Sequence, residues 1–323
     1  MLYPLSFRPI FKERVWGGRK LAELYGKPLP PGVPIGESWE ITDRPEGVSV
    51  IANGPLVGKD LRWLMENHAE DLLGRAAKKS ERFPLLVKIL DARETLSVQV
   101  HPPAAKAAEL GGEPKTEMWY VADATPEADI FVGLKHGVTR AEFERRLDDG
   151  TVADCIHRHP VQRGDAMFLP SGRVHALGGG NVVFEIQQNS DTTYRVFDWN
   201  RAGLDGKPRE LHLEPALASI DFLDFEPDLL TTRFSDTQPF GSLTLSHNPS
   251  FTVFLNRDRA YLGAGTEGMG LYVIALLEGR IEINTGGHRL ALQPGDFCVV
   301  PAGCKDVDIW PETNATYLLV KPG

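Results

Sequence analysis

The chain has 323 residues, of which 42% are hydrophobic and 24% are charged, and its formal net charge is −9. A chain of this size and composition can bury a proper core and is long enough for two domains. The acidic balance argues against a nucleic acid partner, because phosphate groups are bound by basic surfaces, and no apolar run approaches the roughly 18 residues of a membrane span.

Two further features indicate the compartment. The first residues lack the basic region and apolar stretch that mark a secretory signal. The three cysteines, Cys155, Cys298 and Cys304, have no metal-type spacing and are interpreted as reduced thiols. We therefore expect a cytoplasmic protein that has no membrane partner.

Helical patterning is scarce. Apolar residues recur at helix spacing over residues 58–77, which predicts a small helical segment there. Shorter helices are predicted at 103–110, at 140–147 with Thr139 as the N-cap, and at 214–220.

Most of the remaining chain consists of short β-type runs separated by Gly, Pro, Asn and Asp. These runs lie at 84–90, 96–100, 117–121, 166–169, 182–188, 241–245, 251–255, 271–277, 280–283, 297–300 and 315–320. Many short strands with regular turn signals predict a mainly β fold, either a sandwich or a barrel.

An internal repeat indicates two related barrels. Residues 162–172 and 293–303 both read Gln-x-Gly-Asp, four mostly apolar residues and Pro-x-Gly. In this pattern Gly-Asp makes the turn into a strand and Pro-x-Gly makes the turn out of it. We expect a catalytic domain at 1–226, which includes the helical segment at about 58–77, and a second barrel at 227–323. Three residues after the repeat the first copy has His175 but the second has Asp306, so the second barrel is expected to lack a metal.

Four residues form a candidate set of metal ligands. Gln99 and His101 are two apart on a predicted strand and therefore share a face. Glu117 begins the next apolar run and His175 follows a strand-ending turn, so all four could meet at one barrel mouth. An amide oxygen, two imidazoles and a carboxylate suit a borderline divalent ion such as zinc, and the lack of cysteine indicates an open catalytic site.

Several segments resemble a known family. Residues 164–175 look like the second cupin motif, and Gln99-x-His101 with Glu117 looks like a variant of the first. More narrowly, the chain resembles type I phosphomannose isomerases (mannose-6-phosphate isomerases) of the short bacterial kind. The matching segments are 9–13, 16–18, 96–102, 115–120, 170–176 and 185–196. The resemblance covers about residues 1–215 well and the C-terminal barrel in outline. The large helical insertion of longer family members is missing here, which leaves the identity of a lid open.

The resemblance implies a fold, a metal and a set of site residues. The fold is two cupin (jelly-roll) barrels with a few helices. The implied zinc site holds one Zn²⁺ per chain on Gln99, His101, Glu117 and His175. The implied catalytic residues are Arg195, Lys115, Glu185 and Asp191. The implied partner is a small phosphorylated sugar, and the chain is expected to be a monomer or a homodimer.

The chemistry of an aldose–ketose isomerase fits these residue types. A proton must leave the carbon beside a carbonyl and reach the neighbouring carbon, and the enediol intermediate develops negative charge that zinc could stabilise. Lys115 and Arg195 could hold the phosphate or offset that charge. The proton carrier stays open between Glu185, Asp191, Lys115 and a metal-bound water, whereas Arg195 is a poor base because the pKa of arginine exceeds about 12.

Three other functions stay open at this point. One is a different cupin metalloenzyme, such as an iron-dependent oxygenase, which the Gln99 ligand disfavours. Another is a non-catalytic sugar-phosphate-binding cupin, which would not need both Lys115 and Arg195. The last is an isomerase that acts on glucose 6-phosphate.

Overall fold

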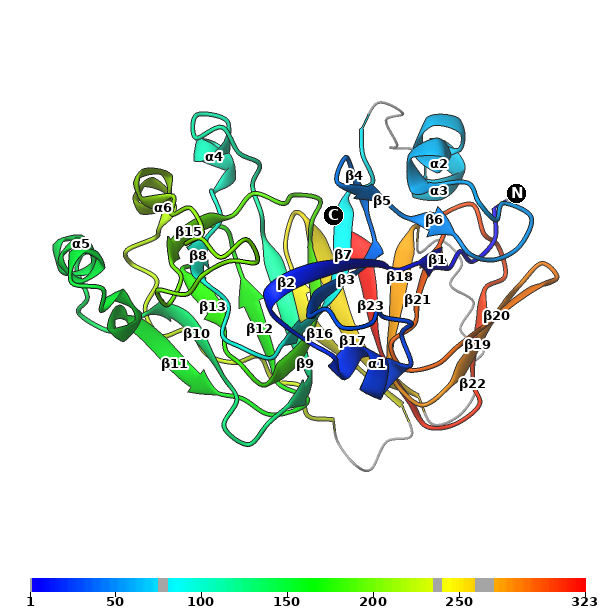
Figure 1. Ribbon diagram of the computed structural model, residues 1–323. Coiled ribbons are helices and arrows are strands. Elements are labelled where there is room, and N and C mark those ends of the chain that lie inside the picture. The colour runs from blue at the N-terminus through cyan, green and yellow to red at the C-terminus, as the bar shows by residue number, and fades with distance from the viewer. Residues whose placement is uncertain (1, 75–80, 235–239, 259–269) are drawn as a thin grey trace. The chain divides into compact units, whose positions relative to one another are not determined.

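The computed structural model describes residues 2–74, 81–234, 240–258 and 270–323 (Figure 1). The chain divides into two compact units. The central unit comprises residues 11–38 and 88–230, and the terminal unit comprises residues 1–10, 39–87 and 231–323. Because a compact unit is not the same as an independently folding domain, the expected division into residues 1–226 and 227–323 stays a prediction. None of the helices in the described part of the chain has the length and apolar character needed to cross a bilayer.

The central unit contains two sheets. The five-stranded sheet has the order β11-β10-β13-β8-β15, and the six-stranded sheet has the order β12-β9-β14-β7-β2-β3. The strands of the first are β8 (Val98–Val100), β10 (Asp129–Leu134), β11 (Ile156–Pro160), β13 (His175–Leu177) and β15 (Tyr194–Phe197). Those of the second are β2 (Ile10–Gly18), β3 (Ile35–Ile41), β7 (Leu85–Ala92), β9 (Glu117–Ala124), β12 (Ala166–Leu169) and β14 (Asn181–Gln188). Of these strands, residues 10, 39–41 and 85–87 are assigned to the terminal unit.

The main core of the central unit draws residues from both sheets. Alternate residues of a strand point to opposite faces, so Trp119 and Val121 of β9 meet Ile130 and Val132 of β10 in one cluster. All four are at most 2% exposed. Burying a side chain of this kind contributes about 1.5–3 kcal/mol, and this sum over many residues stabilises the pair of sheets.

A second apolar cluster involves the helices of the central unit. Val98 and Val100 of β8 pack in it with Phe143 of α5 and Ala216 of α6. The helices of this unit are α1 (Lys20–Tyr25), α4 (Ala104–Ala107), α5 (Arg140–Asp148) and α6 (Leu213–Ser219), with a 3-10 turn η1 (Val152–Cys155). Because Val98 and Val100 belong to this cluster, Gln99 between them points to the opposite face of the sheet.

The predicted helices are found with adjusted ends. Thr139 caps α5 as predicted, since its hydroxyl accepts a hydrogen bond of 3.2 Å from the backbone N–H of Glu142. The helix predicted at 103–110 is shorter, and α1 was not predicted because six residues carry too little periodicity. The segment predicted at 58–77 forms two helices, α2 (Leu61–Asn67) and α3 (Ala69–Leu73), because His68 adopts a non-helical backbone (φ −136°, ψ 27°). Residues 75–77 of that prediction lie outside the described residues.

The terminal unit is built mainly from two further sheets. Its five-stranded sheet has the order β16-β17-β23-β18-β21, and a three-stranded sheet has the order β20-β19-β22. The strands are β16 (Phe240–His247), β17 (Phe251–Asp258), β18 (Tyr272–Glu278), β19 (Ile281–Thr285), β20 (His288–Leu292), β21 (Phe297–Val300), β22 (Asp308–Pro311) and β23 (Ala315–Pro322). The short strands β1 (Phe7–Arg8) and β6 (Val50–Ile51) pair, as do β4 (Asp43–Arg44) and β5 (Gly47–Val48). The prediction of a mainly β, cupin-type fold with a few helices is confirmed.

The sequence repeat is also a structural repeat. Asp165 and Asp296 each accept a 2.9 Å hydrogen bond on a carboxylate oxygen from the N–H of the Gln three residues before. Gly164 (φ 96°) and Gly295 (φ 86°) take the left-handed backbone that favours glycine. The strands that follow, β12 and β21, pair with β9 and β18 respectively, so each copy enters its sheet in the same way.

Candidate metal centre and adjoining cavity

Along their buried face, strands of the central unit change from apolar to charged residues. In β9, Trp119 and Val121 lie in the apolar core and Glu117, on the same face, does not. In β7 the same change occurs between Leu90 and Lys88. The polar residues of several strands therefore gather at one end of the apolar core.

Strand pairing sets the neighbours at this polar end. His175 of β13 lies opposite Gln99 of β8, and Arg195 of β15 lies opposite Gln99 on the other side. In the other sheet Gln187 of β14 lies opposite Glu117. The sequence predicted that the ligand residues come from strand ends, and the pairing brings those ends together.

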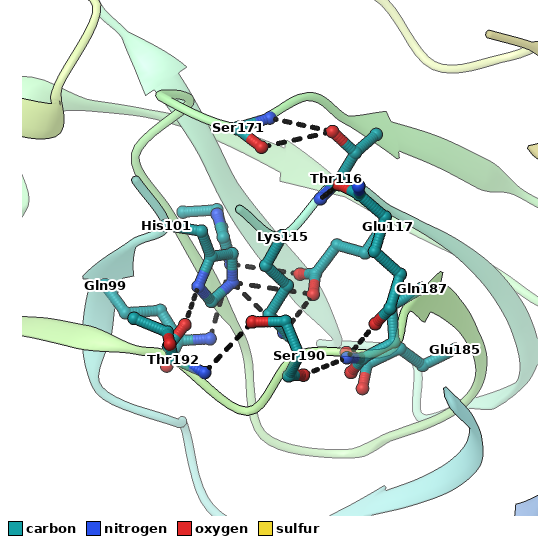
Figure 2. A network of polar contacts seen from close by, with 12 residues as sticks. Gln99, His101, Lys115, Thr116, Glu117, Ser171, Glu185, Gln187, Ser190 and Thr192 are labelled. Atoms are coloured by element: carbon teal, nitrogen blue, oxygen red, sulfur yellow. Dashed lines mark hydrogen bonds and ion pairs between the residues drawn. The ribbon is translucent and has the colours of Figure 1, made fainter. Parts of the chain in front are cut away.

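His101, Glu117 and His175 form a buried cluster that could hold a metal ion. One ligand atom from each lies within 4.8 Å of the others. Nε2 of His101 is 3.5 Å from Oε2 of Glu117 (Figure 2). Nε2 of His175 is 3.1 Å from Oε1 of Glu117. Gln99 adjoins the cluster, with its side-chain nitrogen 3.3 Å from Nε2 of His175. Half a turn of that amide presents its oxygen to the same point.

The hydrogen bonds around the two imidazoles fix their tautomers. Nδ1 of His101 donates to the carbonyl of Thr192 and Nδ1 of His175 donates to the carbonyl of Arg173, both at 2.9 Å. A carbonyl only accepts, so Nδ1 carries the proton and Nε2 keeps its lone pair. Burial and the nearby Lys115 ammonium lower the pKa of His101 to about 3, so this ring is neutral.

The arrangement fits a metal better than it fits a hydrogen-bonded cluster. Two Nε2 lone pairs face the carboxylate of Glu117, and its buried Oε1 has no hydrogen-bond partner. Such an oxygen is costly to bury unless a cation satisfies it. The Lys115 ammonium donates to the other oxygen and, at 3.2 Å, to Nε2 of His101. Burial alone would raise the pKa of Glu117, but the Lys115 ammonium outweighs it and holds that pKa well below the usual range.

A cavity of about 520 Å³ adjoins this cluster. All four predicted catalytic residues line it, and Gln99 does so as well. Further lining residues are Glu13, Arg14, Trp16, Glu37, Lys88, Leu90, Leu96, Ser97, Trp119, Thr193, Leu204, Asp205 and Arg209. The structure therefore brings together every residue that the sequence singled out for the site, although their roles stay predictions.

Arg195 lies at a cationic end of the cavity. Its Nη1 donates 2.7 Å to the carbonyl of Glu210, and its Nε is buried without a partner among the described residues. Burial lowers the pKa of Arg195, and the charges of Arg209 and Arg201 lower it further. Arg201 and Arg209 both donate to the carboxylate of Asp198. Two guanidinium groups thus share the buried Asp198 carboxylate, and Arg195 adds a third positive charge whose hydrogen bond goes to a backbone carbonyl.

Glu185 and Asp191 lie at a second, mixed-charge part of the lining. Glu185 accepts a 3.0 Å hydrogen bond from the indole N–H of Trp119. The Lys88 ammonium is 3.3 Å from Glu185 and 3.8 Å from Asp191. Burial alone would lower the pKa of Lys88, but Glu185, Glu37 and Asp191 outweigh it and raise that pKa above its usual value.

Sequence reasoning missed Lys88, Glu37, Arg14 and Arg209. A signal was present at Lys88, because it is the one charged residue within the run Leu-Leu-Val-Lys-Ile-Leu of an otherwise apolar strand. Burying a charged side chain in such a strand costs desolvation free energy, so an oppositely charged partner is expected nearby. The other three lie in no motif, and pairing between distant strands brings them to the cavity.

The chain is similar to known proteins over most of its length. Residues 5–139 match the family model of phosphomannose isomerase type I, catalytic domain. Mannose-6-phosphate isomerase ManA of Bacillus subtilis (strain 168) is 36% identical over 314 residues, which are 93% of each chain.

Solved structures of mannose 6-phosphate isomerases also match the chain. The mannose 6-phosphate isomerase of Bacillus subtilis matches with a TM-score of 0.88 and 31% identity, over 99% of this chain and 100% of that chain. A mannose 6-phosphate isomerase solved with bound zinc and yttrium matches in fold, with a TM-score of 0.74 and 18% identity over 99% of this chain and 100% of that chain.

Proposed function

The chain belongs to the mannose-6-phosphate isomerase family, and we propose that it is a zinc-dependent enzyme that interconverts mannose 6-phosphate and fructose 6-phosphate. One observation carries this proposal. The buried His101, Glu117 and His175 cluster adjoins a cavity that has guanidinium groups at one end and carboxylates in its wall. A phosphorylated sugar needs a place for its phosphate, its oxygens and its migrating proton, and the cavity offers all of these.

One zinc ion per chain would be held by His101, Glu117 and His175, with the Gln99 amide oxygen as a fourth ligand. The unpartnered Oε1 of Glu117 and the two Nε2 lone pairs support this choice. Nitrogen and carboxylate donors without cysteine are typical of catalytic zinc sites. Bound zinc would polarise sugar oxygens and stabilise negative charge that develops on them.

The cationic residues would bind the phosphate and offset charge. Arg195 and Arg209 line the same end of the cavity, and the buried Nε of Arg195 still offers a hydrogen bond. Guanidinium groups recognise phosphate oxygens in pairs, so this end suits the phosphate. Lys115 lies beside Glu117 and would face oxygens at the sugar's reactive end (Figure 2).

The reaction would pass through an enediol, with a carboxylate as proton carrier. Both Glu185 oxygens have neighbours, since Oε1 accepts from Trp119 and Oε2 faces Lys88. The Asp191 side chain is 37% exposed, and its described ion pair is a long one to Lys88. We therefore assign the proton transfer to Asp191 and a supporting role to Glu185.

Other parts of the proposal follow from the family and the sequence. The enzyme would act in the cytoplasm, as a monomer or homodimer, on a small phosphorylated sugar. The C-terminal barrel at 227–323 would lack a metal and serve packing, assembly or closure of the site. Membership of this family disfavours the iron-dependent oxygenase and the non-catalytic sugar-phosphate-binding cupin.

The deciding experiment measures fructose 6-phosphate formed from mannose 6-phosphate. The assay is run before chelation, after chelation and after zinc is added back, with glucose 6-phosphate as a second substrate. Activity on mannose 6-phosphate that disappears and returns supports the proposal. Activity that survives complete metal removal contradicts the zinc requirement, and no activity in the zinc-loaded protein overturns the isomerase.

A further inference from the structure

A chain of ion pairs lines the Lys88 side of the cavity. Nε of Arg14 is 2.7 Å from Oε1 of Glu37, and Oε2 of Glu37 is 3.7 Å from the Lys88 ammonium. That ammonium is in turn 3.3 Å from Glu185 and 3.8 Å from Asp191. One cation is therefore shared among three carboxylates.

Strand positions explain why these side chains meet. Arg14, Glu37, Lys88 and Glu185 belong to β2, β3, β7 and β14, which are strands of one sheet, and Asp191 follows β14. The side chains of Lys88, Glu37 and Glu185 are 5%, 10% and 4% exposed. Charges so far from water interact strongly, because little solvent screens them.

How the positive charge of Lys88 is shared among the neighbouring carboxylates affects their basicity. The charged groups that act on Lys88 are Glu185 of β14, Glu37 of β3, Asp191 after β14 and, at longer range, Glu117 of β9. Glu37 also holds Arg14 of β2. If Glu37 lost its charge, Lys88 would be left to Glu185 and Asp191, and a carboxylate paired more closely with a cation is a weaker base.

We propose that Glu37 is a positioning residue of the isomerase, which keeps Lys88 shared among Glu37, Glu185 and Asp191 so that Asp191 retains the basicity needed for proton transfer. This inference rests on the proposed function, but it concerns a residue that the proposed function does not use. Arg14, which also lines the cavity and interacts electrostatically with Asp191, binds Oε1 of Glu37, while Oε2 of Glu37 faces Lys88.

The test is Glu37→Gln in the zinc-loaded protein. Glutamine keeps the size of the side chain and removes its charge. We expect kcat to fall about tenfold, KM to stay within about twofold, and the acidic limb of the kcat–pH profile to move to lower pH, because loss of a neighbouring negative charge lowers the pKa of a carboxyl group. Glu37→Asp keeps the charge and should hold that limb near its native position.

A control is available at a glutamate outside the cavity. Glu127 is exposed and does not line the cavity. Glu127→Gln makes the same chemical change and should leave kcat and the pH profile at their native values. Melting temperature and zinc content of each variant confirm that the folded, loaded proteins are compared.

The outcomes separate the two proposals. Native protein that is active, with Glu37→Gln indistinguishable from it, overturns the role of Glu37 alone. A lower kcat with an unmoved acidic limb also overturns it, because a purely structural loss of activity would look like that. An equal loss in Glu127→Gln does the same. Native protein without isomerase activity overturns the proposed function, and with it this inference.

Discussion

Asp191 and Glu185 are both carboxylates of the cavity, and their surroundings differ. Glu185 is held by the Trp119 indole and by Lys88, and its side chain is 4% exposed. Asp191 follows the end of β14 and its side chain is 37% exposed. A group that must release and capture a proton needs access to substrate, whereas a group bonded on both oxygens is suited to hold a neighbour in place.

This difference gives a prediction for Asp191→Asn. Loss of a general acid–base group typically costs on the order of 10²–10⁴-fold in rate, so kcat should fall by that much while the zinc content stays native. Asp205→Asn removes a carboxyl group from an exposed part of the same lining and should have little effect. Steady-state kinetics check both, and a loss under threefold in Asp191→Asn would transfer the role to another group.

At the scale of elements, α1 shows how a short helix is fixed by a distant residue. A carboxylate oxygen of Asp91 in β7 accepts a 2.7 Å hydrogen bond from the backbone N–H of Lys20, the first residue of α1. Arg19 has no side-chain cap of its own, so the cap comes from a strand about seventy residues later. Asp91 is 2% exposed, and burial raises its pKa to about 6, although the hydrogen bonds from α1 lower it.

The raised pKa of Asp91 predicts a pH-dependent stability term. The folded state binds this proton more tightly than the unfolded state, so the contribution favours folding below about pH 4 and is lost as the pH rises through about 6. The loss amounts to roughly 2 kcal/mol, less than the full shift implies because some solvent remains. Asp91→Asn removes the titration, so its melting temperature relative to native should rise between pH 4.5 and pH 7.5. A difference that does not change with pH contradicts this account.

At the scale of the molecule, the metal ligands connect two sheets of the central unit. His175 lies in β13 and His101 directly follows β8, both of the five-stranded sheet, whereas Glu117 lies in β9 of the six-stranded sheet. An ion bound to all three would link the sheets in the folded state only. A ligand that binds only the folded state stabilises it by about 4 kcal/mol at a thousand times its dissociation constant.

Chelation should therefore lower the melting temperature. At about 2–4 °C per kcal/mol for a unit of this size, the zinc-loaded protein should melt on the order of 10 °C above the chelated protein. Calorimetry measures the difference, and His175→Ala provides the control because it should show almost none. Equal melting temperatures for loaded and chelated native protein would contradict a metal that binds the folded chain.

The sequence predicts the candidate metal ligands far better than it predicts the ion-pair network of Arg14, Glu37 and Lys88. Gln99, His101, Glu117 and His175 stand in short motifs whose spacing carries the information. Arg14 and Glu37 stand in none, since their positions depend on which distant strands pair, and one sequence does not specify that. The break at His68 was missed for a related reason, because apolar periodicity continues across a residue whose backbone leaves the helix.

The repeated turn has a consequence for engineering. The same Gly and Asp hydrogen bonds bring β12 and β21 into their sheets, while the position three residues after each repeat carries His175 in one copy and Asp306 in the other. The residues that form the turn are thus different from the residue that supplies the metal ligand. A ligand side chain could therefore be introduced without changing the turn residues. Asp306 has a left-handed backbone (φ 50°), whereas His175 begins strand β13, so a graft of a second metal site would first have to reshape the loop at Asp306.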